Sequence, residues 1–290
     1  MSYTWGDPTQ KKDILINGAS FKTTGSAYSL LLHGGTGAYL WIDALCIDQS
    51  NNDEKATQVL LMGEIYTAAG AVDIWLGPES EDSTTAVNFI FQLKVDLAKL
   101  SKPGQVYNNT STHRREWIAL SKLCRRPWFS RLWVLQEVVL ASNVVRFACG
   151  QQTFAWSDMW EVIQHLDRLE AIPALNGQPN GAADPMNMQI ITPAVQMMRT
   201  AMALHMKRQG NTLDTQAAIQ YVMFVNATDP RDRIYGLHSI AADSTDEELT
   251  PDYNKTVEEV YISTARHLIT KNNSLQLLIF RGYVENSDCK

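Results

Sequence analysis

The sequence predicts an α/β protein with an open parallel sheet, and two observations support this fold class. Short β-prone segments at Ser2–Trp5, Tyr39–Leu45 and Ala71–Gly77 alternate with segments of helical character at Ser26–His33 and 53–69. This strand–helix–strand–helix–strand order is typical of parallel strands joined by right-handed crossovers. The run Tyr39–Leu45 is compact and apolar, as expected of a strand that is buried on both faces.

Local turn signals place the first elements of the chain. The strand at Ser2–Trp5 stops at the turn Gly6-Asp7-Pro8. Asn17-Gly18 is the strongest short hairpin dipeptide, so we expect a hairpin over Asp13–Phe21. The helix at Ser26–His33 is followed by a glycine-rich stretch that ends it.

Helical periodicity dominates the rest of the chain. Ser50–Asp53 matches a capping box and opens a helix whose apolar side chains recur at helical spacing as far as Ala69. One further strand is expected at Asn143–Cys149. The other expected elements are helices at 84–100, 114–124, 132–141, 156–169, 192–208, 213–225, 231–239 and 255–271, and a polar loop at 102–112.

The composition changes along the chain. Every Trp lies between Trp5 and Trp160, whereas Met, Ala, Leu and Gln are enriched from Met186 to Met206. Residues 172–185 are rich in Gly, Pro, Ala and Asn, which indicates a linker or loop. We therefore expect an α/β core over residues 1–175, with a helical insertion around 80–125. A helical C-terminal portion over 186–290 is expected to pack on that core.

Bulk properties exclude several classes of protein. The chain has 290 residues and a formal net charge of -6, which argues against a nucleic-acid-binding protein. No apolar run approaches the roughly 18 residues of a membrane-spanning helix, and the N-terminus lacks the pattern of a signal peptide. The four Cys are scattered without a CxxC pair and are expected to be reduced thiols. We expect a cytoplasmic protein.

The first candidate site lies at the end of the second expected strand. Trp41-Ile-Asp43 would fall at the carboxyl end of a parallel strand, where open α/β sheets bind their ligands. Asp43, Asp48 and Gln49 could line that crevice. The alternative is that Asp43 accepts hydrogen bonds from the nearby backbone and Asp48 caps the following turn.

The second candidate site lies in Arg126–Glu137, which contains two Trp, two Arg and one Glu. Trp133 and Glu137 are at positions i and i+4 and so share a helix face. A carboxylate against an aromatic wall suits cleavage of an N-glycosidic bond, because it stabilises the positive charge that develops on the ribose. Arg126 and Arg131 are forked donors suited to phosphate. The alternative is a structural helix in which Glu137 pairs with one of these Arg.

Other motifs are weaker. The stretch Gly34–Gly37 precedes a strand and no Gly-Lys-Ser/Thr follows it, so it is not a phosphate loop. The six His show no metal-ligand spacing, so we expect no metal site, and nothing indicates a prosthetic group. The segment Asp229–Arg233 is a dense charged turn that reads as a cap with salt bridges that dock a helix; a binding role is the lesser alternative.

Taken together, these segments resemble the fungal heterokaryon-incompatibility (HET) domain and two segments commonly found downstream of it. The segment Arg126–Glu137 also resembles the Trp-x-x-x-Glu element of TIR domains, in which the Glu serves NAD cleavage. The segments that carry the resemblance are Ser2–Gly6, Trp41–Gln49, Trp75–Gly77, Arg126–Glu137, Asp229–Tyr235 and Pro251–Tyr253.

The resemblance implies a TIR-like (flavodoxin-like) open parallel sheet with helical insertions, and a role in programmed cell death when incompatible fungi fuse. It implies NAD as the substrate, cleaved at the nicotinamide–ribose bond, with Glu137 as the catalytic carboxylate. The implied substrate contacts are Trp133, Trp128 or Trp41 on the base, Arg126 or Arg131 on the phosphates, and Asp43 or Tyr3 on the ribose. Self-association or a partner signalling protein is expected. The alternative is a non-enzymatic signalling or oligomerisation module of fungal self/non-self recognition.

Overall fold

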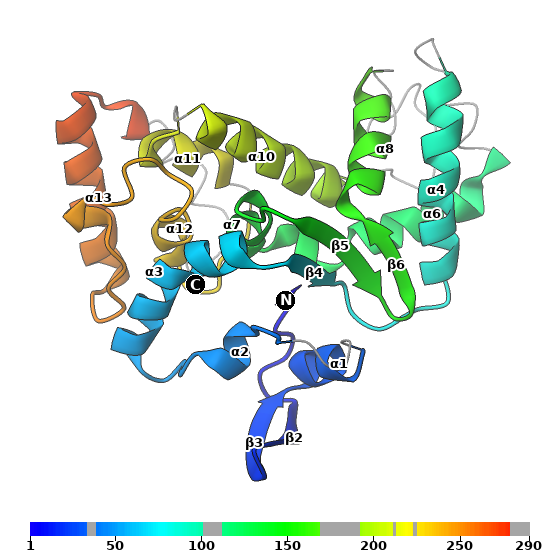
Figure 1. Cartoon of the computed structure of the whole chain (residues 1–290). Coiled ribbons are helices and arrows are strands. Elements are labelled where there is room, and N and C mark those ends of the chain that lie inside the picture. Colours follow the sequence, from blue (N-terminus) through cyan, green and yellow to red (C-terminus); the bar gives the residue numbers. More distant parts are fainter. Residues whose placement is uncertain (34–38, 101–111, 169–191, 211–212, 223–224, 279–290) are drawn as a thin grey trace, which may run out of the picture. The chain divides into compact units, whose positions relative to one another are not determined.

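The computed structural model describes residues 1–33, 39–100, 112–168, 192–210, 213–222 and 225–278 (Figure 1). The chain forms two compact units that interleave in sequence. Unit 1 comprises Met1–Ile42, Ala71–Ser130 and Val144–Met198, and unit 2 comprises Asp43–Gly70, Arg131–Asn143 and Arg199–Lys290. The boundary expected at 175–186 divides the chain into two consecutive segments, whereas each of these units combines three separate segments of the chain.

A four-stranded sheet organises unit 1 in the order β1-β4-β5-β6. Strands β1 (Ser2–Tyr3), β4 (Ala71–Trp75) and β5 (Val144–Cys149) are parallel, and β6 (Gln152–Ala155) returns antiparallel to β5. The predicted α/β class is confirmed, and the sheet is mainly parallel rather than parallel throughout. The antiparallel edge strand β6 is absent from the sequence-based prediction.

The expected hairpin is present as β2 (Lys11–Ile16) and β3 (Ala19–Thr24), a separate two-stranded sheet that is drawn in dark blue in Figure 1. Asn17 and Gly18 both have positive φ, 52° and 83°. A two-residue turn of this kind matches the twist of the flanking strands, which is why Asn-Gly predicts it.

Helices pack against the sheet of unit 1 and contribute side chains to the core of this unit. They are α1 (Gly25–His33), α4 (Ser83–Lys99), α6 (Arg114–Cys124) and α8 (Trp156–Arg168). Helix α4 packs against both α6 and α8 and buries Phe89, Ile90, Leu93 and Leu97. Short helix η1 (Pro127–Ser130) adds Trp128 and Phe129 to the core around Phe147. Helix α10 (Thr192–Gln209) begins in unit 1 and ends in unit 2.

Unit 2 is helical in its described residues, and α3 (Asn52–Ala68) packs against α7 (Trp133–Val139) within it. The side chain of Asn51 caps α3 by accepting hydrogen bonds from Asp53 N–H and Glu54 N–H. The helix is therefore confirmed, but its predicted cap at Ser50 is wrong by one residue. The elements of unit 2 are α2 (Asp43–Cys46), α3 (Asn52–Ala68), α7 (Trp133–Val139), α11 (Thr215–Val222), α12 (Asp232–Tyr235), η2 (Glu247–Leu249) and α13 (Val257–Asn272).

The strand predicted at Tyr39–Leu45 is wrong. Residues 39–42 have no regular structure, and Asp43 begins the short helix α2. Near β1, the amino group of Met1 donates a hydrogen bond to the Trp41 carbonyl at 2.9 Å. A short apolar run does not by itself distinguish a strand from another buried segment, because only ladder pairing makes it a strand.

Three further expectations fall outside the described residues: the glycine-rich stretch 34–37, most of the loop at 102–112 and the linker at 172–185. Within the described part of the chain, no helix is both long and apolar enough to span a bilayer.

Candidate functional site

Helix α7 buries two polar side chains next to each other in sequence. Glu137 has only 3 % of its surface exposed and Gln136 is fully buried. Within the described structure, neither side-chain amide atom of Gln136 has a hydrogen-bond partner. Leaving buried polar atoms unpaired costs stability, so a short helix that buries an amide and a carboxylate side by side calls for an explanation beyond packing.

Trp133 lies on the same face of α7 as Glu137, one helical turn earlier. Its indole Nε1–H donates a hydrogen bond to Oδ2 of Asp232 at 2.9 Å, across 99 positions of sequence. Asp232 begins helix α12 and is buried, with 5 % of its surface exposed. This bond fixes the Trp133 ring and, through it, the orientation of α7.

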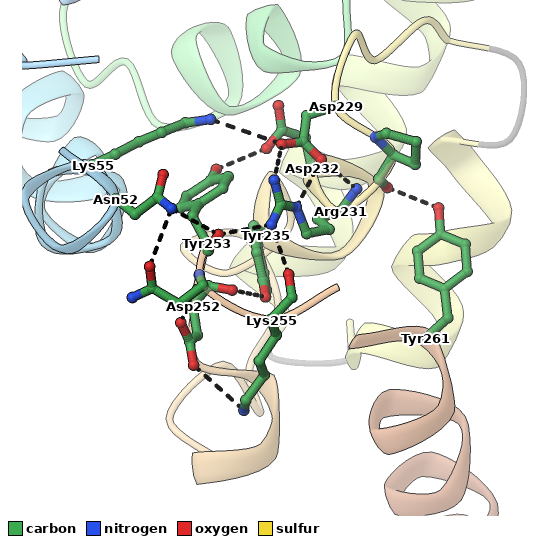
Figure 2. Close-up of polar contacts among 12 residues, drawn as sticks. Asn52, Lys55, Asp229, Arg231, Asp232, Tyr235, Asp252, Tyr253, Lys255 and Tyr261 are labelled. Carbon is green, nitrogen blue, oxygen red and sulfur yellow. Dashed lines mark hydrogen bonds and ion pairs between the residues drawn. The ribbon is translucent and has the colours of Figure 1, made fainter. Parts of the chain in front are cut away.

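Asp232 is a buried member of a cluster of polar side chains (Figure 2). Its second oxygen, Oδ1, accepts a hydrogen bond from the hydroxyl of Tyr253 at 2.7 Å. Burial raises the pKa of Asp232, while the bonds from Tyr253 and Trp133 and the charge of Lys55 oppose that rise. Burial and the neighbouring Asp232 raise the pKa of Tyr253, so its hydroxyl remains a donor. Both carboxylate oxygens therefore have a protein donor.

A second carboxylate in the cluster, Asp229, is held by Arg231. The guanidinium donates from Nε to Oδ1 at 3.0 Å and from Nη2 to Oδ2 at 2.8 Å. Burial alone would raise the pKa of Asp229, but the bonds and charge of Arg231 and the charge of Lys55 outweigh it and lower that pKa. Arg231 Nη1 also donates to the carbonyls of Tyr253 and Lys255 at 2.8 and 2.7 Å. Through the bidentate pair with Asp229 and these two backbone bonds, Arg231 connects the segment around Asp229 to the segment around Tyr253 and Lys255.

The start of helix α3 completes the cluster. Nζ of Lys55 lies 3.7 Å from the centre of the Tyr253 ring and 3.9 Å from Oδ2 of Asp229. Nδ2 of Asn52 donates to the Tyr253 carbonyl at 3.1 Å. Figure 2 shows these side chains converging from α3 and from the segments around residues 229–235 and 252–255. The cluster is a set of matched donors and acceptors, and its effect is to position α7 and hence Glu137.

Four of the residues predicted to contact substrate belong to unit 1, and three of them serve its structure. Trp128 is fully buried, and its Nε1–H donates to Ser2 Oγ at 2.7 Å. Arg126 donates through Nη1 to the carbonyls of Leu76 and Pro78 at 2.8 and 3.0 Å. Tyr3 is buried in strand β1. The fourth, Trp41, is half-buried.

The other predicted residues, Asp43, Arg131, Trp133 and Glu137, belong to unit 2. Asp43 accepts a hydrogen bond at Oδ1 from the Ala44 N–H at 2.8 Å, and Asp48 Oδ1 accepts one from the Ser50 N–H at 2.9 Å. These bonds match the structural alternative for both residues. The backbone of Arg131 forms an isolated parallel bridge with Asn226.

Sequence reasoning missed the partnership of Trp133 with Asp232 and Tyr253. The structural interpretation of Asp229–Arg233 agrees with the Asp229–Arg231 ion pair, but nothing local to that segment indicates which helix it docks. Among the described residues, no group of three or more His, Cys, Asp or Glu side chains could hold a metal ion.

Comparison with known proteins shows that the N-terminal half of the chain is similar to a known family. Residues 1–137 match the family described as heterokaryon incompatibility protein (HET). The chain is similar to the HET family over these 137 of its 290 residues. The matched segment ends at Glu137 and includes the three α7 residues discussed above, Trp133, Gln136 and Glu137, together with the capped start of α3.

A fungal relative extends the similarity beyond the HET domain. The chain is 25 % identical to heterokaryon incompatibility protein 6, OR allele, of Neurospora crassa over 332 aligned residues, which cover 95 % of this chain and 48 % of that protein. The chain thus spans about half the length of this curated relative. No solved structure matches the chain.

Proposed function

We propose that the chain acts in heterokaryon incompatibility as a cell-death effector, and that it does so by hydrolysing NAD at the nicotinamide–ribose bond. The HET domain over residues 1–137 and the similarity to an incompatibility protein of N. crassa support the first part. The observation that carries the second part is the buried Glu137, held on a helix whose neighbouring Gln136 amide is buried without a hydrogen-bond partner in the described structure.

A TIR-like fold is part of this proposal. Strands β1, β4 and β5 are parallel, and α7 with its Trp-x-x-x-Glu spacing directly precedes β5. The sheet lacks the strand that the resemblance implies at 39–43, since those residues form no ladder. The three parallel strands and the position of α7 support the relationship.

The proposed cleavage of the nicotinamide–ribose bond relies on a carboxylate that is shielded from solvent. As the bond between nicotinamide and the ribose C1′ breaks, its electron pair leaves with the nicotinamide ring and positive charge develops on the ribose. The Glu137 carboxylate stabilises that charge, and its effect is larger in a site from which water is excluded. Water then adds to C1′ and loses a proton, which gives ADP-ribose.

The structure narrows the set of supporting residues. Trp133 is a positioning residue, because its indole N–H is already bound to Asp232. Within unit 2, Arg131 remains a candidate for the phosphates and Asp43 remains a candidate for the ribose. Trp128, Arg126 and Tyr3 leave the proposed set, since their side chains are buried or bound within unit 1.

Access to Glu137 requires a change of conformation. A side chain with 3 % of its surface exposed cannot reach the ribose of a bound dinucleotide until its surroundings move. We therefore propose that self-association, or a partner signalling protein, opens the site, so that the isolated chain at low concentration has little activity. Nicotinamide release should then rise more steeply than in proportion to protein concentration.

The test is nicotinamide release from NAD by the purified full chain over a range of protein concentrations. Glu137→Gln keeps the shape of the side chain and removes its charge, and the matched control is Glu64→Gln on the exposed surface of α3. Loss of at least about a hundredfold in rate for Glu137→Gln alone is expected, in line with the loss of one transition-state electrostatic contact. Equal turnover by wild type and Glu137→Gln would refute the catalytic role.

A second candidate function is a non-enzymatic signalling or oligomerisation module, and the β2–β3 hairpin favours it. Leu15 is 76 % exposed and Phe21 is 39 % exposed on this two-stranded sheet. Unpaired strand edges with apolar side chains are prone to pair with another chain. If Leu15→Lys abolished killing while Glu137→Gln left it intact, the signalling function would replace NAD hydrolysis.

A further inference from the structure

The β2–β3 hairpin is exposed along most of its length and anchored at its base. Every residue from Lys11 to Lys22 is exposed except Ile14, which is half-buried, whereas Thr23 and Thr24 are buried. Both strands contact helix α1, and the Ala27 N–H of that helix donates a hydrogen bond to the Thr24 hydroxyl at 3.2 Å. The end of the hairpin that carries the turn is therefore open to solvent.

The strand register places exposed apolar side chains on both faces of the hairpin. Ile14 pairs with Phe21, and Leu15 pairs with Ser20. Because successive residues of a strand point to opposite faces, Ile14 and Ile16 share one face with Phe21, and Leu15 lies on the other. Leu15 is 76 % exposed, Phe21 is 39 % exposed and Ile16 is 38 % exposed. A protein that docked on one face would leave the apolar side chains of the other face in water.

Lysine side chains follow the apolar ones on both faces. Lys12 lies on the face of Phe21, and Lys11 and Lys22 lie on the face of Leu15. Residues 11–22 contain three Lys and one Asp, so they carry a net charge of +2 in a chain whose net charge is -6. Each face thus has apolar side chains towards the turn and a cation towards the base.

The spacing of these two zones matches the surface of a lipid bilayer. Strands rise about 3.3 Å per residue, so Ile14 and Phe21, three residues from the turn, lie roughly 10 Å from it. Apolar side chains of interfacial segments insert about 5–10 Å into the boundary between headgroups and acyl chains. The Lys side chains, further from the turn, then lie at the level of the headgroups. The unpaired backbone groups of the strand edges restrict the hairpin to this hydrated region, because they have no partners in hydrocarbon.

We propose that the β2–β3 hairpin binds the surface of an anionic lipid bilayer, with its apolar end inserted among the headgroups and its three Lys against the anionic groups. A bilayer covers both faces of the hairpin at once, as the distribution of its apolar side chains requires. Attraction between the Lys side chains and anionic lipid adds to the burial of apolar surface. The inference does not rest on NAD hydrolysis, since it involves neither Glu137 nor its surroundings.

Flotation of the full chain with phosphatidylcholine vesicles that contain or lack phosphatidylserine measures this binding. Binding to vesicles with phosphatidylserine is expected to be at least roughly tenfold stronger, because each Lys near an anionic surface contributes about fivefold. It should weaken as salt is added, since salt screens exposed charges. No binding to vesicles with phosphatidylserine, or equal binding to both kinds of vesicle, would overturn the proposal.

Matched variants locate the binding on the hairpin. Leu15→Ser should weaken it at least roughly tenfold, whereas Ile262→Ser, at a side chain of α13 that is 57 % exposed, should leave it unchanged. Lys12→Gln should weaken it about fivefold, and Lys99→Gln, at a side chain of α4 that is 70 % exposed, should not. Equal losses in a variant and its control would show that the vesicles bind elsewhere and would overturn the proposal.

The other possible occupant of the hairpin is a second copy of the chain. Sedimentation velocity without vesicles, over a range of protein concentrations, tests it. The proposal expects wild type and Leu15→Ser to show the same oligomeric state at each concentration. A dimer of the wild type that is lost in Leu15→Ser would assign the hairpin to a contact between protein chains, and the membrane proposal would be wrong.

Discussion

Removing the hydroxyl of Tyr253 probes the cluster that positions α7. In Tyr253→Phe the ring stays under Lys55, so the cation–π contact at 3.7 Å is kept. The hydrogen bond to Asp232 Oδ1 at 2.7 Å is lost, and the buried carboxylate keeps only Trp133 as donor. The substitution therefore isolates one bond to one buried charge.

The expected magnitude comes from the charge of the acceptor. A hydrogen bond to an ionised group contributes about 1.5–3 kcal/mol, against about 0.5–1.5 kcal/mol for a bond between neutral groups. Tyr235 is the matched control, because it is equally buried at 2 % exposure and its hydroxyl donates to a neutral carbonyl, that of Asp252, at 2.9 Å. We expect losses in the free energy of unfolding of about 2 kcal/mol for Tyr253→Phe and about 1 kcal/mol for Tyr235→Phe.

The loss of stability in Tyr253→Phe is expected to depend on pH, whereas the loss in Tyr235→Phe is not. Burial raises the pKa of Asp232 above its ordinary value of 3.8, so the folded chain binds a proton more tightly than the unfolded chain. Stability from this group consequently falls as pH rises between 3.8 and the raised value. The Tyr253 hydroxyl opposes that rise in pKa, so its removal raises the pKa further and costs more stability above this window than below it.

Urea unfolding at a series of pH values between about 4.5 and 7.5 measures the effect. The loss for Tyr253→Phe should grow with pH, and the loss for Tyr235→Phe should stay constant. In the background of Asp232→Asn, which removes the charge, Tyr253→Phe should lose its pH dependence. Equal and parallel losses for the two Tyr variants would refute the assignment of Asp232 as a buried carboxylate held by Tyr253.

Three other substitutions test separate parts of the structure. Trp133→Phe removes the donor to Asp232 Oδ2 and should lower stability by about 1.5–3 kcal/mol in urea unfolding; additivity with Asp232→Asn in a double-mutant cycle would contradict the bond. Thr256→Ala removes the capping box of α13 and should cost about 1 kcal/mol, measured in the same way, and a neutral result would mean that the cap does not stabilise the helix. Gly18→Ala places a side chain at φ +83° with open space around it, so backbone strain of about 1–2 kcal/mol should speed amide exchange in β2 and β3, whereas unchanged exchange would argue against the turn.

Local signals predict the local structure well. Asn17-Gly18 predicts the hairpin because its turn requires positive φ at both residues, and helical periodicity predicts α6 at the bounds that the structure shows. The strand predicted at Tyr39–Leu45 is wrong because its evidence was apolar composition, and strand formation depends on a partner distant in sequence. Strand β6 was missed since four residues are too few to show a period.

The candidate site was predictable in part. The i, i+4 spacing, which can be read from the sequence alone, places Trp133 and Glu137 on one face of α7. The role of Trp128 in the core depends on Ser2, 126 positions away, and that of Trp133 depends on Asp232. No pattern within one segment encodes such long-range bonds, so aromatic and cationic residues near a motif are easily mistaken for ligand contacts.

We propose that the Glu137 carboxylate acts in the destruction of NAD and that the loss of NAD kills the cell. The most direct test measures intracellular NAD and viability over time in fungal cells that express wild type, Glu137→Gln or the surface control Glu64→Gln at equal protein levels. We predict that NAD falls before viability in the wild type and in Glu64→Gln, and that both stay normal in Glu137→Gln. Death of the Glu137→Gln cells at the wild-type rate with NAD intact would show that Glu137 does not kill through loss of NAD.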